Sequence, residues 1–428
     1  MYRKTILPNS LRLLTQEMPH TKSVSICIFA GTGSRYEPER IGGVSHFIEH
    51  LLFRGTERRP ASRDISESIE GVGGILNGGT DREATVYWAK SASSHFMSTL
   101  DTLCDMLLNS RFDPADIEKE RQVIVEEIHM TEDQPDQKAC QLIDTVLWPG
   151  HPLGRDIAGT EATVNATTRD DIMVYMAEHY RPDNIVVSVA GGLPHQAIIE
   201  AVTGQLGGWS ARRQPFNRME PFRSQQGQRI VIEPRVIEQD HFLLAMPALS
   251  LTDPRRYTES LLNVILGEGM SSRLFTEIRD RLGLAYAIHS YTDFLLDTGS
   301  LTVAASVDPD NLLQAVTAVI TELELLKSTL TPHELVKAKE LSKGRMALKL
   351  EDSRHVASWN GGQEIMTGEV LTPDEVINRI EAVTLDDLQS LAEELIQPEK
   401  FRLSVVGPVT DESPFHDLLR TTAIIQAQ

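Results

Sequence analysis

The chain has 428 residues, 41% of them hydrophobic and 24% charged, and its 61 acidic residues exceed its 41 basic residues for a net charge of −20. This composition is typical of a globular protein, and the length leaves room for two domains. The acidic balance argues against nucleic acid as a partner, because phosphate binding depends on a surplus of Lys and Arg, and no apolar run is long enough to cross a bilayer.

The amino-terminal segment 1–10 has neither the apolar core of a secretion signal nor the Arg/Ser-rich character of an organellar presequence. We therefore expect a cytoplasmic protein, from a bacterium. The cysteines are Cys27, Cys104 and Cys140, too few and too scattered for a disulfide framework or a zinc cluster. We expect them to be buried free thiols.

Strands and helices are predicted to alternate irregularly along the chain. Alternating apolar residues predict short strands at 24–30 and 85–89 in the first half, and at 242–246 and 300–304 in the second. Amphipathic helical stretches flank these strands. This order favours an α+β fold in which helices cover one face of a mostly antiparallel sheet.

Residues 46–50 (HFIEH) stand in a predicted helix between glycines on either side. On a helix the positions i, i+3 and i+4 share one face, so His46, Glu49 and His50 can point at a single place. In the inverzincin interpretation the two neutral imidazoles bind Zn²⁺, and the carboxylate accepts a proton from the zinc-bound water. The alternative is a set of solvated surface residues. The otherwise apolar helix argues against it, because buried imidazoles need partners.

A second helix is predicted over 114–128, where Pro114 and Asp116 favour a helix start. Its apolar stripe consists of Ile117, Val123, Ile124 and Ile128. Glu120 and Glu127 are two turns apart and share a face, whereas Glu126 lies about 100° round the helix from Glu127. The helix can therefore bring one carboxylate of this pair to a metal, although an acidic helix face can equally be solvated.

Four segments together resemble one family. HFIEHLLFRGT at 46–56, GGILN at 73–77, the Thr80 and Glu83 pair, and ERQVIVEE at 120–127 are similar to the pitrilysin/insulinase family of zinc peptidases. The nearest resemblance is to its short bacterial members, which are similar to the β subunit of mitochondrial processing peptidase. The resemblance implies the fold of that peptidase, with two homologous domains.

The resemblance also implies roles for individual residues. His46 and His50 would be metal ligands, and the third ligand would be Glu127, which lies 127 − 50 = 77 residues after the second histidine. Glu49 would be the general base. Glu120 would be an accessory catalytic residue that supports the ligands without binding the metal.

Further family positions are matched beyond the metal residues. The segment 267–286 resembles the glycine-rich segment of the family and its Arg/Tyr pair, here Arg279 and Tyr286, which would donate hydrogen bonds to the substrate carbonyl or the oxyanion formed from it. Asn77 matches the position that binds the substrate backbone. The next residue is Gly78, where family members commonly have Ala, and this departure adds local flexibility.

A repeat without gaps relates the two halves of the chain. At an offset of 216 residues, Thr168-x-Asp-Asp meets Thr384-x-Asp-Asp, and a helix, a proline and an apolar strand follow in both copies. The repeat predicts duplicated domains at 1–210 and 229–428, joined by a linker at 211–228. Only the first copy has the HxxEH residues, so the second is expected to handle substrate.

The expected function is that of a zinc metalloendopeptidase that hydrolyses unfolded peptides or small proteins inside a clamshell chamber. Because the chain is half as long as the four-domain members of the family, we expect it to pair with an identical chain or with a related one. Two alternatives stay open. One is a non-catalytic or scaffolding subunit of a complex like the processing peptidase, and the other is a dedicated processing protease for one peptide.

Overall fold

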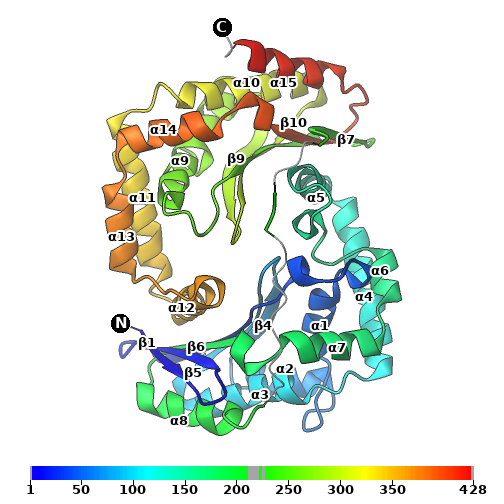
Figure 1. Ribbon diagram of the computed structural model, residues 1–428, viewed down its shortest axis with the longest axis vertical. Coiled ribbons are helices and arrows are strands. Elements are labelled where there is room, and N and C mark those ends of the chain that lie inside the picture. The colour runs from blue at the N-terminus through cyan, green and yellow to red at the C-terminus, as the bar shows by residue number, and fades with distance from the viewer. Residues whose placement is uncertain (1, 211–220, 224–226, 426–428) are drawn as a thin grey trace. The chain divides into compact units, whose positions relative to one another are not determined.

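The computed structural model describes residues 2–210, 221–223 and 227–425, so the linker expected at 211–228 lies mostly outside the described residues. The chain divides into two compact units. Undescribed residues aside, unit 1 comprises Met1–His129, Arg155–Glu220 and Met346–Thr372, and unit 2 comprises Met130–Gly154, Pro221–Arg345 and Pro373–Gln428. Each unit is built on one sheet, as Figure 1 shows.

The sheet of unit 1 has six strands in the order β1-β2-β6-β3-β5-β4. Their bounds are β1 Arg3–Ile6, β2 Arg12–Glu17, β3 Ser23–Ala30, β4 Ile75–Thr80, β5 Thr85–Ala92 and β6 Ile185–Gly191. Only the β2–β6 pair is parallel. Strand β4, which follows residues 46–50 in sequence, lies at the edge of the sheet.

The sheet of unit 2 has five strands in the order β7-β11-β8-β10-β9, and again one pair, β7–β11, is parallel. The strands are β7 Ile230–Pro234, β8 Asp240–Ala248, β9 Ala285–Phe294, β10 Gly299–Val307 and β11 Arg402–Gly407. In chain order, β7, β8, β9, β10 and β11 of unit 2 correspond to β2, β3, β4, β5 and β6 of unit 1. With this correspondence, the strand order of unit 2 is the order β2-β6-β3-β5-β4 of unit 1. The expected α+β fold, with two homologous domains and mostly antiparallel sheets, is confirmed.

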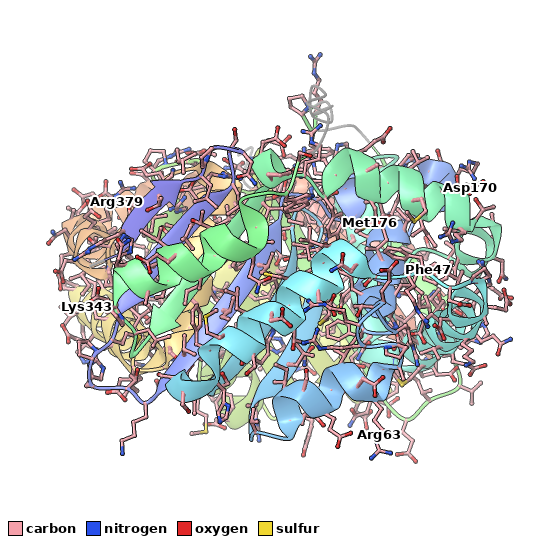
Figure 2. All side chains as sticks on the ribbon, turned by 90° about the horizontal axis from the view of Figure 1, so that it is seen from below. Phe47, Arg63, Asp170, Met176, Lys343 and Arg379 are labelled. Atoms are coloured by element: carbon pink, nitrogen blue, oxygen red, sulfur yellow. The ribbon has the colours of Figure 1, made fainter. Side chains whose placement is uncertain are left out.

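Most helices of unit 1 pack on one face of its sheet around a shared core. They are α1 Val44–Leu52, α2 Ser62–Glu70, α3 Phe96–Asn109, α4 Pro114–Asp133, α6 Glu161–Ala166, α7 Arg169–His179 and α8 His195–Leu206, with the last turn of α4 assigned to unit 2. Of the residues labelled in Figure 2, Phe47 of α1 belongs to this core and Met176 of α7 packs against it, whereas Arg63 of α2 and Asp170 of α7 are exposed.

The helices that unit 2 takes from the second half of the chain are α9 Arg256–Gly267, α10 Leu312–Leu326, α11 Pro332–Lys349, α13 Pro373–Ala382, α14 Leu385–Leu395 and α15 Ser413–Ile425, with the end of α11 assigned to unit 1. A π-helix spans Phe275–Arg281. The repeat seen in the sequence recurs in the helix caps. Thr168 begins α7 by accepting a hydrogen bond from the backbone of Asp171, and Thr384 begins α14 with the equivalent bond from Asp387.

Two helices are exchanged between the sequence halves. Helix α12, Ser353–Thr367, comes from the second half and packs on β3 and β6 of unit 1, where Figure 1 shows it in orange. Helix α5, Pro135–Leu147, comes from the first half and packs on β8 and β11 of unit 2. Shifting the start of α5 by the repeat offset gives 135 + 216 = 351, so the two helices are counterparts. The domain bounds 1–210 and 229–428, each one continuous stretch of the chain, stay a prediction.

The exchanged helix α12 covers the sheet face opposite α1. Leu14, Cys27, Phe29 and Val186 of the sheet are buried against Val356 and Ala357 of α12.

Of the three free cysteines, Cys27 and Cys104 are buried as expected, whereas Cys140 on α5 is exposed. Within the described residues, no helix has both the length and the apolarity that crossing a bilayer requires.

Candidate metal centre

Helix α1 carries the HxxEH residues on one face and the core on the other. It begins after Gly43, whose φ of 93° favours glycine, and ends before Phe53. Its core side consists of Val44, Phe47, Ile48, Leu51 and Leu52, all buried. Since these positions follow a helical period, His46, Glu49 and His50 share the opposite face, away from the hydrophobic core.

Helix α4 supplies the carboxylates. Its buried residues are Ile117, Glu120, Ile124 and Ile128. Val123, which we expected in the apolar stripe, is instead 39% exposed, because it lies about 100° round the helix from Ile124 and so off the buried face. Seven residues after Glu120, Glu127 lies at the margin of that face, while Glu126 is exposed. The helix therefore presents one buried and one partly exposed carboxylate towards α1.

Three ligand atoms converge between α1 and α4. The Nε2 atoms of His46 and His50 are 3.2 Å apart, and Oε2 of Glu127 lies 3.8 Å from the first and 3.5 Å from the second. Ligands about 2.0 to 2.1 Å from a zinc ion in a tetrahedron are separated by about 3.3 Å. Among the described residues, this is the one group of three His, Cys, Asp or Glu side chains that could hold a metal ion. The donor set fits zinc, which is bound by nitrogen and oxygen ligands of this kind.

The residues behind His50 fix its orientation. Its Nδ1 lies 3.0 Å from Oε2 of Glu120, which is 2% exposed. Arg54 forms an ion pair with the other oxygen of Glu120, so the carboxylate stays an acceptor and His50 donates from Nδ1. The lone pair of Nε2 then points at the candidate site. A carboxylate behind a ligating histidine is the usual arrangement of metal centres.

The protonation states also suit metal binding. Burial, and then the neighbouring His50, lower the pKa of His46 to about 4, so its imidazole is neutral at neutral pH, as a ligand must be. Burial raises the pKa of Glu49, and the charge of Glu127 adds to this effect. A general base benefits from such a shift, because a carboxylate with a raised pKa binds a proton more readily.

Strand β4 holds Glu49 from the other side. Oγ1 of Thr80 donates a hydrogen bond of 2.6 Å to Oε2 of Glu49. A Cβ atom at Gly78 would lie 2.9 Å from Oε1 of Glu49 and 3.1 Å from the ring of Phe53. Glycine at this position therefore leaves Oε1 uncrowded, whereas an alanine would press against the end of the Glu49 side chain.

Asn77 lies on the edge strand but on the other face of the sheet from Gly78, because successive residues of a strand alternate. Its Oδ1 accepts a hydrogen bond of 2.7 Å from the backbone of Gly78. The structure thus brings Gly78 next to Glu49 and leaves the exposed Asn77 beside the strand edge.

Arg279 and Tyr286 lie together in unit 2. The guanidinium carbon of Arg279 is 4.7 Å from the ring centre of Phe275 and 5.8 Å from that of Tyr286. Tyr286 is 74% exposed. Arg279 is on the π-helix, a backbone form that is frequent at functional sites. The pair that the sequence predicted is thus formed in space.

Sequence reasoning missed the supporting contacts of the site. It assigned no role to Arg54, to Thr80 or to Glu83, whose buried side chain pairs with Arg35 and ties the β4–β5 hairpin to the loop before α1. Thr80 and Glu83 are part of the family-like motif, so the pattern singled out their positions. Their partners are remote in sequence, and no local periodicity could have identified them.

Comparisons with known proteins show which family the chain resembles. Residues 12–161 match the family model described as insulinase (peptidase family M16), and residues 166–342 match that of the peptidase M16 inactive domain. An uncharacterized zinc protease of Streptomyces coelicolor is 36% identical over 97% of this chain and 92% of its own length. The uncharacterized zinc protease YmxG of Bacillus subtilis is 36% identical over 95% and 98%, respectively.

Solved structures share the fold over the whole chain. A protease from Helicobacter pylori has a TM-score of 0.91 at 21% identity, covering 95% of this chain and 99% of its own. A chain of complex III2 from Candida albicans has a TM-score of 0.83 at 18% identity, covering 97% and 99%. At such identities the likeness shows the architecture of the two units and nothing of their chemistry.

Proposed function

The chain belongs to the insulinase family of peptidases, family M16, and on that premise we propose that it is a zinc metalloendopeptidase acting on unfolded peptides or small proteins. One observation carries the proposal. The ligand atoms of His46, His50 and Glu127 converge at tetrahedral spacing, with Glu49 on the same helix face and outside the ligand set. The names of the two relatives described above, both zinc proteases, support it.

In this mechanism His46, His50 and Glu127 would hold Zn²⁺. When bound there, the ion would act as a Lewis acid, polarising the scissile carbonyl and lowering the pKa of the attacking water towards roughly 7. Glu49 takes the proton of that water and delivers it to the leaving amine. Thr80 keeps one oxygen of Glu49 in place, so the other oxygen is available for the proton.

We further propose that the substrate binds as an additional strand along β4. Its backbone groups would pair with the free edge of this strand, with Asn77 and Gly78 as contact residues. Arg279 and Tyr286 would donate to the carbonyl oxygen as negative charge develops on it, where fixed donors contribute most. The exposure of Tyr286 is consistent with a group that meets a substrate.

Incubation of the purified chain with a mixed peptide pool is expected to give cleaved products that vanish when a zinc chelator is added and return with stoichiometric zinc. The reason is that water activation depends on the bound ion. Mass spectrometry of the products measures this. Cleavage that resists the chelator, or no cleavage by a chain with zinc bound, would contradict the proposal and favour the scaffolding role.

We also propose that the chain works as a dimer in which Arg279 and Tyr286 serve the zinc site of the partner. The Glu49→Gln chain and the Arg279→Ala chain are then each expected to be nearly inactive alone. Loss of the Arg279 donor should lower kcat about 10²- to 10³-fold. An equimolar mixture of the two chains should regain about a quarter of wild-type activity, because half of the dimers are mixed and each holds one intact site.

The control for this mixing experiment is Arg281→Ala, two residues further along the same π-helix. Arg281 is exposed and paired with Glu277, so its loss should leave activity near that of the wild type. A mixture that stays as inactive as its two components would rule out pairing in trans.

A further inference from the structure

A buried carboxylate outside helix α1 binds the start of that helix. Glu37 is 3% exposed, and it accepts hydrogen bonds of 2.6 Å from the backbone N–H of Gly43 and 2.7 Å from that of Ser45. The first N–H groups of a helix have no partner within the helix, and a capping side chain usually satisfies them. Here that acceptor comes from six residues before the cap position.

The position of the cap explains why the acceptor is remote. The cap residue is Gly43, with φ at 93°, and a Cβ atom there would lie 2.2 Å from the carbonyl oxygen of Ala158. A Ser, Thr or Asp therefore cannot stand at the cap position. Glu37 substitutes for the missing side chain, and its carboxylate lies at the positive end of the helix dipole, which favours the ionised form.

Ser45 extends this contact into a buried polar network. Its Oγ lies 2.9 Å from the hydroxyl of Tyr175 on α7, which lies 2.7 Å from Oγ1 of Thr32 after β3. All three side chains are at most 2% exposed. The network joins the first turn of α1 to two neighbouring parts of unit 1, and His46 is the next residue after Ser45.

The cost of burying Glu37 indicates that the group has a use. Burial raises its pKa to about 7, although the hydrogen bonds from Ser45 and Gly43 and the charge of Arg155 act in the opposite direction. Buried charges add little to stability compared with apolar residues of the same size. A role that such groups can have is to fix one local conformation. The conformation that Glu37 contacts is the first turn of α1, a helix of only nine residues.

We propose that Glu37 is a positioning residue of the metal centre, acting through Gly43 and Ser45 to hold His46 at the correct angle to His50. The inference rests on the proposed zinc site. Metal sites tolerate ligand displacements of only about 0.5 Å. Because His46 is in the first turn and His50 in the last, a loosened first turn changes the separation of their nitrogens directly.

Unit 2 offers a matched control. Glu259 on α9 is likewise buried, accepts a hydrogen bond of 2.9 Å from the backbone of Leu249, and has its pKa raised to about 8 by burial. It belongs to the unit without the HxxEH residues. Loss of Glu259 therefore tests what a buried, backbone-binding carboxylate contributes to folding alone.

The experiment compares zinc affinity, by competition with a chromophoric chelator, with the Tm of the metal-free protein. Glu37→Ala is expected to lower zinc affinity about 10- to 100-fold, as outer partners of metal ligands do. Glu37→Gln keeps one acceptor oxygen, so its zinc affinity should lie between those of Glu37→Ala and the wild type. Glu259→Ala should lower the Tm but leave zinc affinity within about twofold of the wild type.

The inference is overturned if Glu37→Ala lowers the Tm but leaves zinc affinity within about twofold of the wild type, as expected for Glu259→Ala. Should either alanine variant fail to fold, the pair Glu37→Gln and Glu259→Gln decides by the same comparison, because both keep the size of the side chain. A wild-type chain that binds no zinc would refute the proposed function instead. Peptide hydrolysis adds a second measurement, in which kcat should fall for the Glu37 variants while KM stays unchanged.

Discussion

Glu49→Gln is expected to lower kcat about 10²- to 10⁴-fold and to leave zinc bound. The amide has the size of the carboxylate and can still accept the hydrogen bond from Thr80, so α1 keeps its structure. It cannot accept the proton of the attacking water. Glu49 is also not among the residues whose ligand atoms converge, so the variant keeps all three candidate ligands.

Zinc content and kcat measured on the same preparation test this separation of roles. Full zinc occupancy with a large loss of kcat is the expected result. Loss of zinc on this substitution would show that Glu49 is a ligand. Unchanged hydrolysis would show that another group accepts the proton, and the mechanism would then be wrong.

Glu127→Gln is expected to remove both zinc and activity. Outer partners of metal ligands contribute about 10- to 100-fold to metal affinity, so loss of a ligand should exceed about 100-fold. The neutral amide oxygen attracts the dication less than a carboxylate does. Activity should fall in proportion to the zinc that remains bound.

The adjacent Glu126 makes an internal control for this prediction. Glu126→Gln changes the same charge on the same helix, but the side chain is exposed and outside the converging group, so zinc affinity should stay at the wild-type level. Zinc bound by chelator competition is the measurement. If Glu126→Gln were the damaging change and Glu127→Gln harmless, the third ligand would have to be reassigned.

The sequence predicted the local elements well because periodicity determines them. The strands expected at 24–30 and 242–246 are observed as Ser23–Ala30 and Asp240–Ala248. The repeat offset predicted the duplication, and the matching strand orders confirm it. Local patterns predict the type of element reliably because the period of the apolar residues differs between helix and strand. The period is the same whichever surface covers the apolar stripe.

The same reasoning explains what the sequence did not predict. An amphipathic stripe on α5 or α12 indicates burial, but it does not say which sheet receives the helix, so the exchange stayed hidden. Val123 lies about 100° round α4 from the buried Ile124 and is exposed, whereas Glu120 lies on the buried face through contacts with His50 and Arg54. Such contacts join residues 66 to 70 positions apart, and no short motif records them.

Because α12 comes late in the chain, one face of the first sheet stays uncovered during much of synthesis. The last strand of the first sheet ends at Gly191, but the helix that covers its second face ends at Thr367, so 367 − 191 = 176 further residues must be synthesised first. At ~5–20 residues per second on the ribosome this takes about 10 to 35 s. Throughout that interval Leu14, Phe29 and Val186 lack the α12 residues that bury them. Chaperones that bind exposed apolar strands can therefore act on this protein before its synthesis is complete.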